Sequence, residues 1–334
     1  MRPVAQQHQR TDGVLPEVPS VDPLVSVIIP THNYARYLPE AIESALAQDY
    51  SPLEIIVIDD GSTDSTRAAV EPYRERGVEY VYQENSGPGP ARNEGIRRAR
   101  GDVVAFLDAD DSWLPEKISM QIAHLRAHPD LGLVGSAGFD CDSANRPTGV
   151  RNAPAIDAEM AFERLLVWNF VQPSGAIVPK RCLDEVGGFK NMRFGEDWDL
   201  WLRIAQHYPI GFVRKPLFMR REHPASLSLE IGERLFVSYQ SIAASHLHAA
   251  QPAWMRPVIK RRLRATAHFY AAGQALTLSR RRLARHLLSS LWLDPFSHSN
   301  AKLILLLRAV LPDRGFRWLR KLSGRPPGQS PERV

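Results

Sequence analysis

The first part of the chain alternates between short apolar runs and segments with a helical pattern. Val25–Pro30 and Leu53–Asp59 are nearly continuous apolar stretches, which are typical of strands buried on both faces of a parallel sheet. We expect further strands and intervening helices as follows: strands at Val78–Gln83, Val103–Leu107 and Leu131–Gly135, and helices at Tyr37–Gln48, from the cap cluster Asp60–Asp64 to Arg76, at Pro90–Arg100 and at Pro115–His128. This alternation predicts an α/β fold with a Rossmann-like, doubly wound sheet.

The pattern is less regular over residues 141–230 and helical from Ile231 onward. The expected elements of the irregular part are helices at Asp157–Trp168 and Glu196–His207 and short strands near Gly175–Val178 and Gly211–Arg214. The expected later helices are Ile231–Ala250, Met255–Thr277, Arg281–Leu291, Ala301–Ala309 and Gly315–Leu322. The predicted units are a disordered leader over 1–22, an α/β domain over 23–230 with halves 23–140 and 141–230, an all-helical region over 231–323 and a disordered tail over 324–334.

Charge is distributed unevenly along the 334 residues. Residues 251–334 hold 17 Lys/Arg and 3 Asp/Glu, whereas residues 1–250 hold 25 and 34. An acidic body joined to a basic tail suggests that the tail meets an anionic partner, and a solvated helical surface is the alternative. Ordinary hydrophobic (44%) and charged (24%) contents exclude wholesale disorder.

The apolar runs and cysteines set the expected compartment. The longest run, Leu303–Leu307, is five residues, far below the roughly 20 that span a bilayer. The polar leader has no apolar signal core. Cys141 and Cys182 are too few for a disulfide framework or a zinc cluster and fit a reducing compartment. The sequence therefore predicts a cytoplasmic protein.

Three polar clusters follow predicted strands. They are Thr31–Asn33, Asp59–Ser62 and Asp108–Asp111. The carboxyl ends of parallel strands meet at one edge of a sheet, where ligands bind in such folds. Carboxylates this close raise one another's pKa unless a cation neutralises them, and oxygen ligands favour Mg²⁺ or Mn²⁺. When few carboxylates hold such an ion, phosphate oxygens usually occupy its remaining coordination sites, so a nucleoside diphosphate is the expected partner.

Five motifs along the chain resemble, in order, the signatures of glycosyltransferase family 2. They read VSVIIPTHN at Val25–Asn33, VIDDGSTD at Val57–Asp64, NSGPGPARNEGI at Asn85–Ile96, FLDADD at Phe106–Asp111 and GEDWDLWLR at Gly195–Arg203. The resemblance covers about residues 24–225. It implies a GT-A fold, with the nucleotide-sugar in the half 23–140 and the acceptor in the half 141–230. It also implies transfer of a sugar from a nucleotide-sugar to an acceptor hydroxyl, with inversion and a divalent cation.

The resemblance assigns a set of residues to the donor. Those implied to bind the nucleoside and diphosphate are Pro30, Thr31, Asn33, Asp60, Asn85, Arg92, Asn93, Asp108 and Asp110. Asp60 would reach the base. Asp110 would be the principal metal ligand of the DxD pair, and Asp108 would meet the ribose or a metal-bound water. Asp111 could exchange roles with Asp110, and His223 resembles a late histidine near the metal; a salt bridge of Arg92 and a non-ligating His223 are the alternatives.

Glu196 and Asp197 match the family's catalytic acidic pair, with Asp197 at the general-base position. Inversion requires a carboxylate that accepts the acceptor's proton on the face away from the metal. Compensation of the helix dipole is the alternative reading of this acidic pair. Asp199 lies about 200° around the helix and should face elsewhere.

Two further features lie near the acidic pair. Gly187-Gly188-Phe189 suits a turn with positive φ that lets backbone approach the sugar. Trp198 or Trp201 could stack on a sugar ring, with Trp201 the better candidate for the core.

The basic tail interleaves Arg and Lys with Trp and Leu. The clusters are Lys260–Arg264, Arg280–Arg285 followed by Leu287–Leu293, and Arg314–Leu322. This composition suits helices that lie on anionic headgroups, and a helical cap on the catalytic domain is the alternative. No nucleic-acid-binding motif accompanies the charge, so no nucleic acid is expected.

The combined interpretation is a non-processive inverting glycosyltransferase. The donor would be a UDP-sugar, with dTDP- and GDP-sugars open, and the acceptor a glycan or glycolipid such as a lipid-linked or cell-surface polysaccharide intermediate on the inner face of the cell membrane. A sugar nucleotidyltransferase is the alternative enzyme, although PTHNYARYL lacks the Gly-rich basic loop of that class. A non-catalytic nucleotide-sugar- or glycan-binding module is the other alternative.

Overall fold

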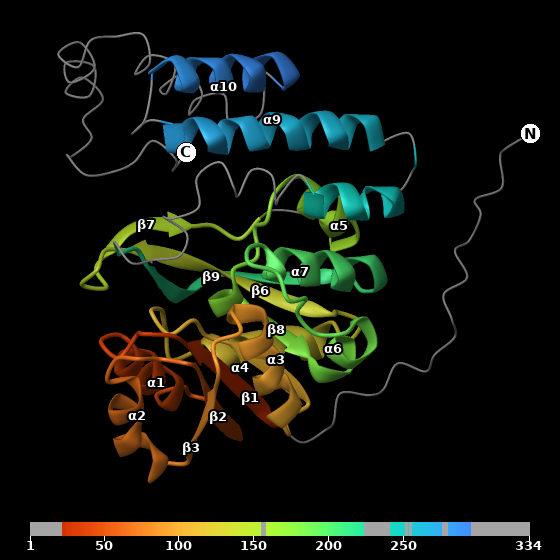
Figure 1. The fold of residues 1–334 in the computed structure, drawn as a ribbon. Coiled ribbons are helices and arrows are strands. Elements are labelled where there is room, and N and C mark those ends of the chain that lie inside the picture. Colours follow the sequence, from red (N-terminus) through yellow and green to blue (C-terminus); the bar gives the residue numbers. More distant parts are fainter. Residues whose placement is uncertain are drawn as a thin grey trace, which may run out of the picture.

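The centre of the molecule is one nine-stranded mixed sheet. The computed structural model describes residues 22–154, 158–223, 241–250, 253, 256–275 and 280–294. The strands follow the order β3-β2-β1-β4-β8-β6-β9-β5, and β7 pairs with β6 (Figure 1). Their bounds are β1 Val25–Thr31, β2 Leu53–Asp60, β3 Val78–Gln83, β4 Val103–Phe106, β5 Ser112–Trp113, β6 Leu133–Cys141, β7 Pro147–Arg151, β8 Ile177–Pro179 and β9 Ile210–Arg221.

The first four strands in the sheet order are parallel and covered on both faces. Successive residues of β1 point to opposite faces, so Ile28 joins one core cluster and Val27 and Ile29 join the other. The helices α1 Leu38–Leu46, α2 Thr66–Arg74 and α4 Lys117–Ala127 contribute to the cluster with Val27, and α3 Pro88–Arg98, α5 Ala161–Val167, α6 Lys180–Val186 and α7 Glu196–His207 to the cluster with Ile28. The α/β fold with a doubly wound sheet is confirmed.

The second half of the sheet departs from the expected regular alternation. β8 pairs antiparallel with both β4 and β6, so the expected fifth strand does not lie beside the fourth. β6 extends to Cys141 and β9 to Arg221, well beyond the expected Gly135 and Arg214, because the two strands pair in parallel over most of that length. The sequence did not predict β5, β7 or α6. β5 is only two residues long, and such an element leaves no hydrophobic period to read.

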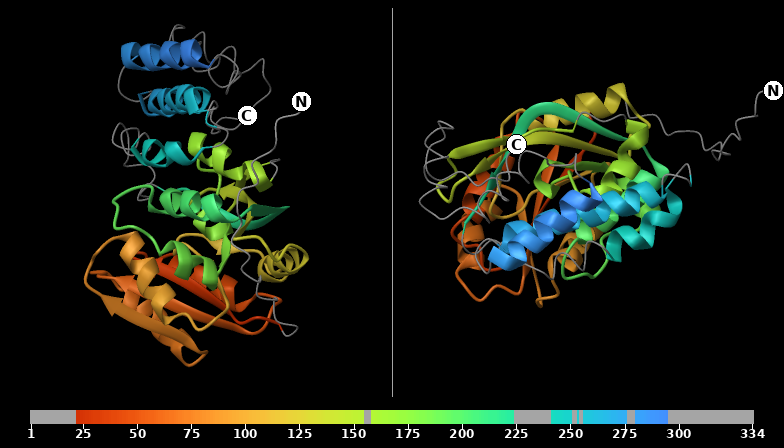
Figure 2. Two further views of the ribbon diagram at one scale, coloured as in Figure 1. Left: turned by 90° about the vertical axis from the view of Figure 1, so that its right-hand side faces the viewer. Right: turned by 90° about the horizontal axis from the view of Figure 1, so that it is seen from above.

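The described C-terminal residues are helical. They include residues 241–246, a 3₁₀ turn at Leu247–Ala249, and the helices α9 Arg256–Ala275 and α10 Arg280–Leu293. α9 packs on α5, and α10 lies beyond α9 at the end farthest from the sheet (Figures 1 and 2). Leu263 of α9 is buried in the core cluster that includes α5 and α7, Leu287 of α10 is buried as well, and Ser290 Oγ of α10 donates to Ala265 O of α9 at 2.7 Å.

Several expected elements lie outside the described residues. They are the leader except for Asp22, most of the helix 231–250, the helices 301–309 and 315–322, and the tail 324–334. No helix within the described ranges is both long enough and apolar enough to cross a bilayer.

Candidate active site

The expected polar clusters meet at one edge of the sheet. β1, β2 and β4 are parallel, so Thr31, Asp60 and the Asp108–Asp111 segment lie at the same edge. α7 places its first residue there as well, because Arg92 Nη1 donates to Glu196 Oε1 at 2.8 Å while Nη2 donates to Asp108 Oδ1 at 2.7 Å. The chain segments that carry the five motifs therefore converge on a single site.

The predicted nucleoside residues are tied into one loop cluster. Asn33, with φ +60°, accepts at Oδ1 from Thr63 N at 2.8 Å. Asn85 Nδ2 donates to Asp60 O at 3.0 Å. Gly61 has φ +76°, and a Cβ there would stand 2.7 Å from Asn85 N, so this turn requires glycine.

Asp60 already accepts several hydrogen bonds. Its Oδ1 accepts from Gln83 Nε2 at 2.7 Å and from Ser86 N at 2.9 Å, and its Oδ2 accepts from Gly87 N at 2.8 Å. A base contact would therefore share these oxygens. Pro30 is half-buried in β1. The buried hydroxyl of Thr31 has no hydrogen-bond partner among the described residues, so a ligand could supply one.

Asp110 and His223 form the part of the site best suited to a cation. His223 Nε2 lies 3.1 Å from Asp110 Oδ2, and the Tyr37 ring lies against the His223 ring with centroids 4.6 Å apart. Asp108 lies beside them and stays partly exposed, with Arg92 on one oxygen. The described residues include no cluster of three Asp, Glu, His or Cys side chains arranged to hold a metal. Carboxylate oxygens and an imidazole fit Mn²⁺.

Asp111 is less suited to ligate a metal than Asp110. Its Oδ2 accepts from Ser174 Oγ at 2.6 Å and its Oδ1 from Arg221 N at 2.9 Å. Burial, followed by the charges of Asp110 and Asp108, raises the pKa of Asp111 well above its ordinary value. Asp111 therefore ties its own segment to the 3₁₀ turn Pro173–Gly175 and to β9.

The predicted base, Asp197, lies in the first turn of α7 and is partly buried. Asn169 Nδ2 donates to Asp197 Oδ2 at 3.0 Å. Burial and the neighbouring Glu196 charge raise the pKa of Asp197 to about 7, against the opposing effects of Arg92 and the Asn169 hydrogen bond. A carboxylate with this pKa is both ionised in part and able to take up a proton at neutral pH.

Arg92 forms salt bridges, which were the alternative to a role at the donor, and its donor role stays a prediction. The two bridges join Asp108 of the predicted DxD pair to Glu196 at the start of α7. Its side chain is 6% exposed, and Asp108 and Glu196 together outweigh the effect of burial and raise its pKa. The guanidinium therefore stays charged between two carboxylates that would otherwise repel.

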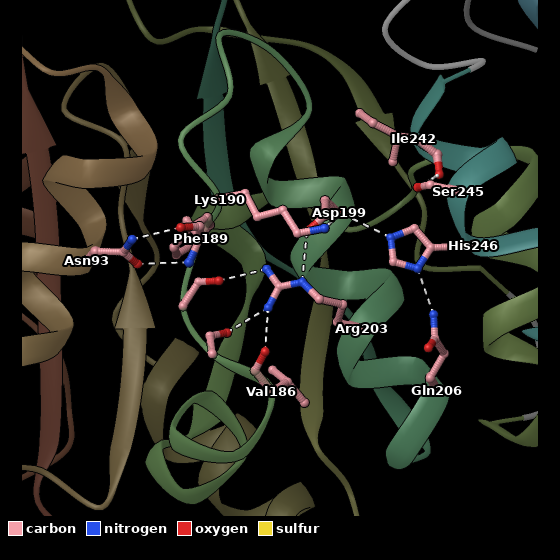
Figure 3. A network of polar contacts seen from close by, with 12 residues as sticks. Asn93, Val186, Phe189, Lys190, Asp199, Arg203, Gln206, Ile242, Ser245 and His246 are labelled. Carbon is pink, nitrogen blue, oxygen red and sulfur yellow. Dashed lines mark hydrogen bonds and ion pairs between the residues drawn. The ribbon is translucent and has the colours of Figure 1, made fainter.

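The side-chain amide of Asn93 makes two hydrogen bonds to the backbone of Phe189. Its Nδ2 donates to Phe189 O at 2.7 Å, and its Oδ1 accepts from Phe189 N at 2.8 Å (Figure 3). Gly187 has the expected positive φ, +77°. A Cβ at Gly188 would overlap Asn93 Oδ1, so the close approach made at this glycine is to Asn93.

The two tryptophans of α7 belong to the core. Trp198 and Trp201 are 1% and 0% exposed, so the expectation that Trp198 could stack on a sugar is wrong for this structure. Trp198 Nε1 donates to Leu165 O at 2.7 Å. Asp199 faces away from Asp197, as the helical angle predicts, and pairs with Lys190 and Arg203.

Sequence reasoning missed three residues that hold the site. Asn169 donates to Asp197, Ser174 donates to Asp111, and Arg221 donates from Nε to Asp110 O at 2.8 Å. Asn169 and Ser174 come from the irregular part of the chain, where no period marks them. Arg221 stands two residues before His223, and that proximity was the available signal.

Part of the chain matches a known protein family. Residues 26–187 match the family described as Glycosyl transferase family 2. These residues form a family 2 glycosyltransferase domain. An uncharacterised glycosyltransferase of Rickettsia typhi is 32% identical over 210 residues, which are 61% of this chain and 65% of that relative. The match thus spans just under two thirds of the relative's length.

Two solved structures resemble this chain in fold over most of its length. TarS 1–349 of S. aureus, in complex with UDP-GlcNAc, has a TM-score of 0.59 at 19% identity and covers 90% of this chain and 91% of its own. The mannosyltransferase PcManGT from Pyrobaculum calidifontis, in complex with GDP-Man and Mn²⁺, has a TM-score of 0.54 at 21% identity, with 90% and 89% covered. These similarities confirm the GT-A fold.

Proposed function

We propose that the protein is an inverting glycosyltransferase that moves a sugar from a nucleotide-diphosphate sugar to an acceptor hydroxyl. The observation that carries this proposal is the placement of Asp197. It lies beside Glu196, which Arg92 joins to the first aspartate of the DxD pair, Asp108. The pKa of about 7 suits a general base at neutral pH.

The donor would bind along the carboxyl edge of the parallel strands. The proposed donor residues are Pro30, Thr31, Asn33, Asp60, Asn85, Arg92, Asn93, Asp108 and Asp110. A UDP-sugar is the first choice, and the UDP-GlcNAc and GDP-Man in the two similar structures support the nucleotide-sugar class. The unpartnered hydroxyl of Thr31 supports a ligand at this edge.

Mn²⁺ or Mg²⁺ would bind at Asp110, with His223 and Asp108 as the neighbouring ligands. Such an ion is usually held by one or two carboxylates together with substrate phosphates. When bound, it would neutralise the charge that develops on the diphosphate leaving group. Mn²⁺ in the PcManGT structure supports this choice of ion.

In the proposed reaction, Asp197 accepts the proton of the acceptor hydroxyl while that oxygen attacks the anomeric carbon. Asn169 orients the Asp197 carboxylate by donating a hydrogen bond to its Oδ2. Arg92 keeps Glu196 and Asp108 in place and, by its charge, opposes complete protonation of Asp197. We assign positioning to Asn169 and Arg92 and proton transfer to Asp197.

The acceptor proposed is a glycan or glycolipid presented at an anionic membrane on its cytoplasmic side. Lys260, Arg261 and Arg264 are exposed on α9. On α10, Leu288 and Trp292 are 58% and 84% exposed and lie four residues apart, on one face. Exposed cations together with an exposed indole suit attachment to anionic headgroups.

A nucleotide panel tests the proposal first. The chain is heated with UDP, dTDP, GDP, CDP or ATP, each with Mn²⁺ and with EDTA, and the melting temperature is recorded. We expect one diphosphate to stabilise the protein only with the metal. The matching nucleotide-sugar should then release its diphosphate, and release of pyrophosphate from a nucleoside triphosphate and a sugar phosphate would instead indicate the nucleotidyltransferase. Metal-linked binding without any turnover would indicate the non-catalytic module.

A further inference from the structure

Asp199 is a buried carboxylate with three basic partners. Lys190 Nζ lies 2.8 Å and His246 Nε2 3.0 Å from its Oδ1, and Arg203 Nε lies 2.8 Å from its Oδ2 (Figure 3). Burial by itself would raise the pKa of Asp199, but the hydrogen bonds from His246, Lys190 and Arg203 outweigh it and hold the pKa below its ordinary range. The carboxylate is therefore a permanently charged centre two residues after the proposed base.

Arg203 uses the rest of its guanidinium to hold the loop 186–190. Its Nη1 donates to Val186 O and Gly187 O, and its Nη2 to Gly188 O, each at 2.7 Å. From the opposite side, Asn93 of α3 holds the same loop through both backbone atoms of Phe189. The loop 186–190 is thus fixed between α3 and α7.

These contacts close a ring of three segments, namely α3, the loop 186–190 and α7. Arg92, the neighbour of Asn93 on α3, binds Glu196 at the start of α7. α3 and α7 are therefore joined twice, directly by Arg92–Glu196 and indirectly by Asn93, the loop 186–190 and Arg203. A shift of α7 would move Asp197 relative to Asp108, and the ring opposes that shift.

His246 contacts this set of segments at Asp199. Like α7, it lies beyond residues 26–187, which match the family. An ionised carboxylate can only accept hydrogen bonds, so the Nε2–H group of His246 donates to Asp199. Nδ1 of the same imidazole lies 2.7 Å from Gln206 Nε2. Asp199 and Gln206 lie seven residues apart on α7, two turns along the same face, so one imidazole spans α7 over two turns.

The packing around His246 supports the same conclusion. His246 is 7% exposed, and the nearby Ile242 and Ala243 are 3% and 0% exposed. Both belong to the core cluster that contains Trp198 and Trp201 of α7. The residues 241–250 are therefore built into the same core as the helix that carries the proposed base.

We propose that His246 is a positioning residue for glycosyl transfer. By holding Asp199, it fixes Arg203, the loop 186–190 and the orientation of α7, and so keeps Asp197 in place. This inference rests on the proposed function. It makes residues 241–250, which lie beyond the expected boundary at 230, a working part of the catalytic unit.

Two variants of the full chain separate the role of His246 from simple packing. The amide nitrogen of Gln stands about as far from Cα as Nε2, so His246→Gln keeps a donor for Asp199. His246→Asn ends one carbon sooner and loses that donor. The first measurement is the rate of UDP release from UDP-GlcNAc with Mn²⁺, divided by the concentration of UDP-binding sites that calorimetry gives. The second is hydrogen–deuterium exchange of the peptide that contains residues 186–190.

We expect His246→Asn to lower the turnover number about 10- to 100-fold, because small misplacements of catalytic groups cost that much. Its UDP dissociation constant should stay within about twofold of wild type, because the hydrogen bonds of His246 reach Asp199 and Gln206 of α7 rather than the nucleoside loops. Exchange in 186–190 should accelerate. His246→Gln should restore turnover and slow exchange.

Equal turnover and equal exchange in all three proteins would overturn the inference. The inference would also be overturned if, in both variants, UDP release fell only in proportion to the number of UDP-binding sites. In that case the substitutions would act only by reducing the amount of folded protein. A wild-type chain that releases UDP from no sugar donor contradicts the proposed function instead. In that event the exchange of 186–190 still decides whether His246 holds the loop.

Discussion

Asp197 combines a raised pKa with a fixed orientation, and each can be tested at the level of one residue. Asp197→Asn keeps the shape and a partner for Asn169 but removes the proton acceptor. We expect transfer to fall about 10²- to 10⁴-fold, which is the usual contribution of a general base. Nucleotide binding should be unchanged in calorimetry. Near-normal transfer by this variant would show that another group takes the proton.

The same pKa predicts a pH profile for the wild-type enzyme. Transfer measured at saturating donor should rise about tenfold per pH unit below pH 7 and level off above it, because only ionised Asp197 accepts a proton. The stability effect has the opposite sign. A folded pKa above the unfolded value makes ionisation of Asp197 costly to the fold, so stability is lost as the pH rises from about 4 through 7. Asp197→Asn should therefore raise the melting temperature more at pH 8 than at pH 5.

The metal assignment separates two adjacent aspartates. Asp110→Ala should abolish the Mn²⁺-dependent part of nucleotide stabilisation, because it removes the carboxylate beside His223. Asp111→Asn is the matched control. The raised pKa of Asp111 favours its neutral form, and an amide can keep the contacts to Ser174 and Arg221. If Asp111→Asn removed the metal-linked shift and Asp110→Ala did not, the two roles would be exchanged.

At the scale of elements, the loop 186–190 depends on close contact with α3. Gly188→Ala would place a methyl group against Asn93 Oδ1, and overpacking of this kind costs about 1–3 kcal/mol. We expect a lower free energy of unfolding in urea and slower transfer. Asn93→Ala removes the obstacle together with two hydrogen bonds, so the double variant should lose less than the sum of the two single variants. Additive losses would mean that the side chain and the loop act separately.

The sequence predicted those elements whose signals are local. The apolar run of β1 and the acidic residues after β4 could be read directly, and parallel strands necessarily bring their ends to one edge. The insertion of β8 between β4 and β6 could not be read, because it depends on pairing between Ala105 and Ile177, far apart in the chain. The double contact of Asn93 with Phe189 spans 96 residues and is equally hidden. Motif order located the site, while tertiary contacts decided which side chains hold it.

At the scale of the molecule, α10 lies at the end farthest from the sheet (Figure 2) and exposes two large apolar side chains. Arg285 is exposed, and Leu288 and Trp292, three and seven residues later, lie on the same face. The indole and the leucine side chain can be buried in the membrane interface, and the nearby cations attract anionic headgroups. We therefore expect binding to vesicles of phosphatidylcholine with phosphatidylglycerol and weak binding to vesicles of phosphatidylcholine alone.

Two variants separate the apolar from the electrostatic part of that binding. Trp292→Ser should weaken binding to both kinds of vesicle in a flotation assay, because it removes buried apolar surface. Lys260→Gln with Arg261→Gln should weaken binding to the anionic vesicles only, by about 2 kcal/mol or roughly 30-fold, since each cation near an anionic surface contributes about 1 kcal/mol. Neither change touches the sheet edge, so nucleotide binding in solution should persist. Vesicle binding that survives both changes would mean that another part of the chain contacts the membrane and that these side chains of α9 and α10 do not.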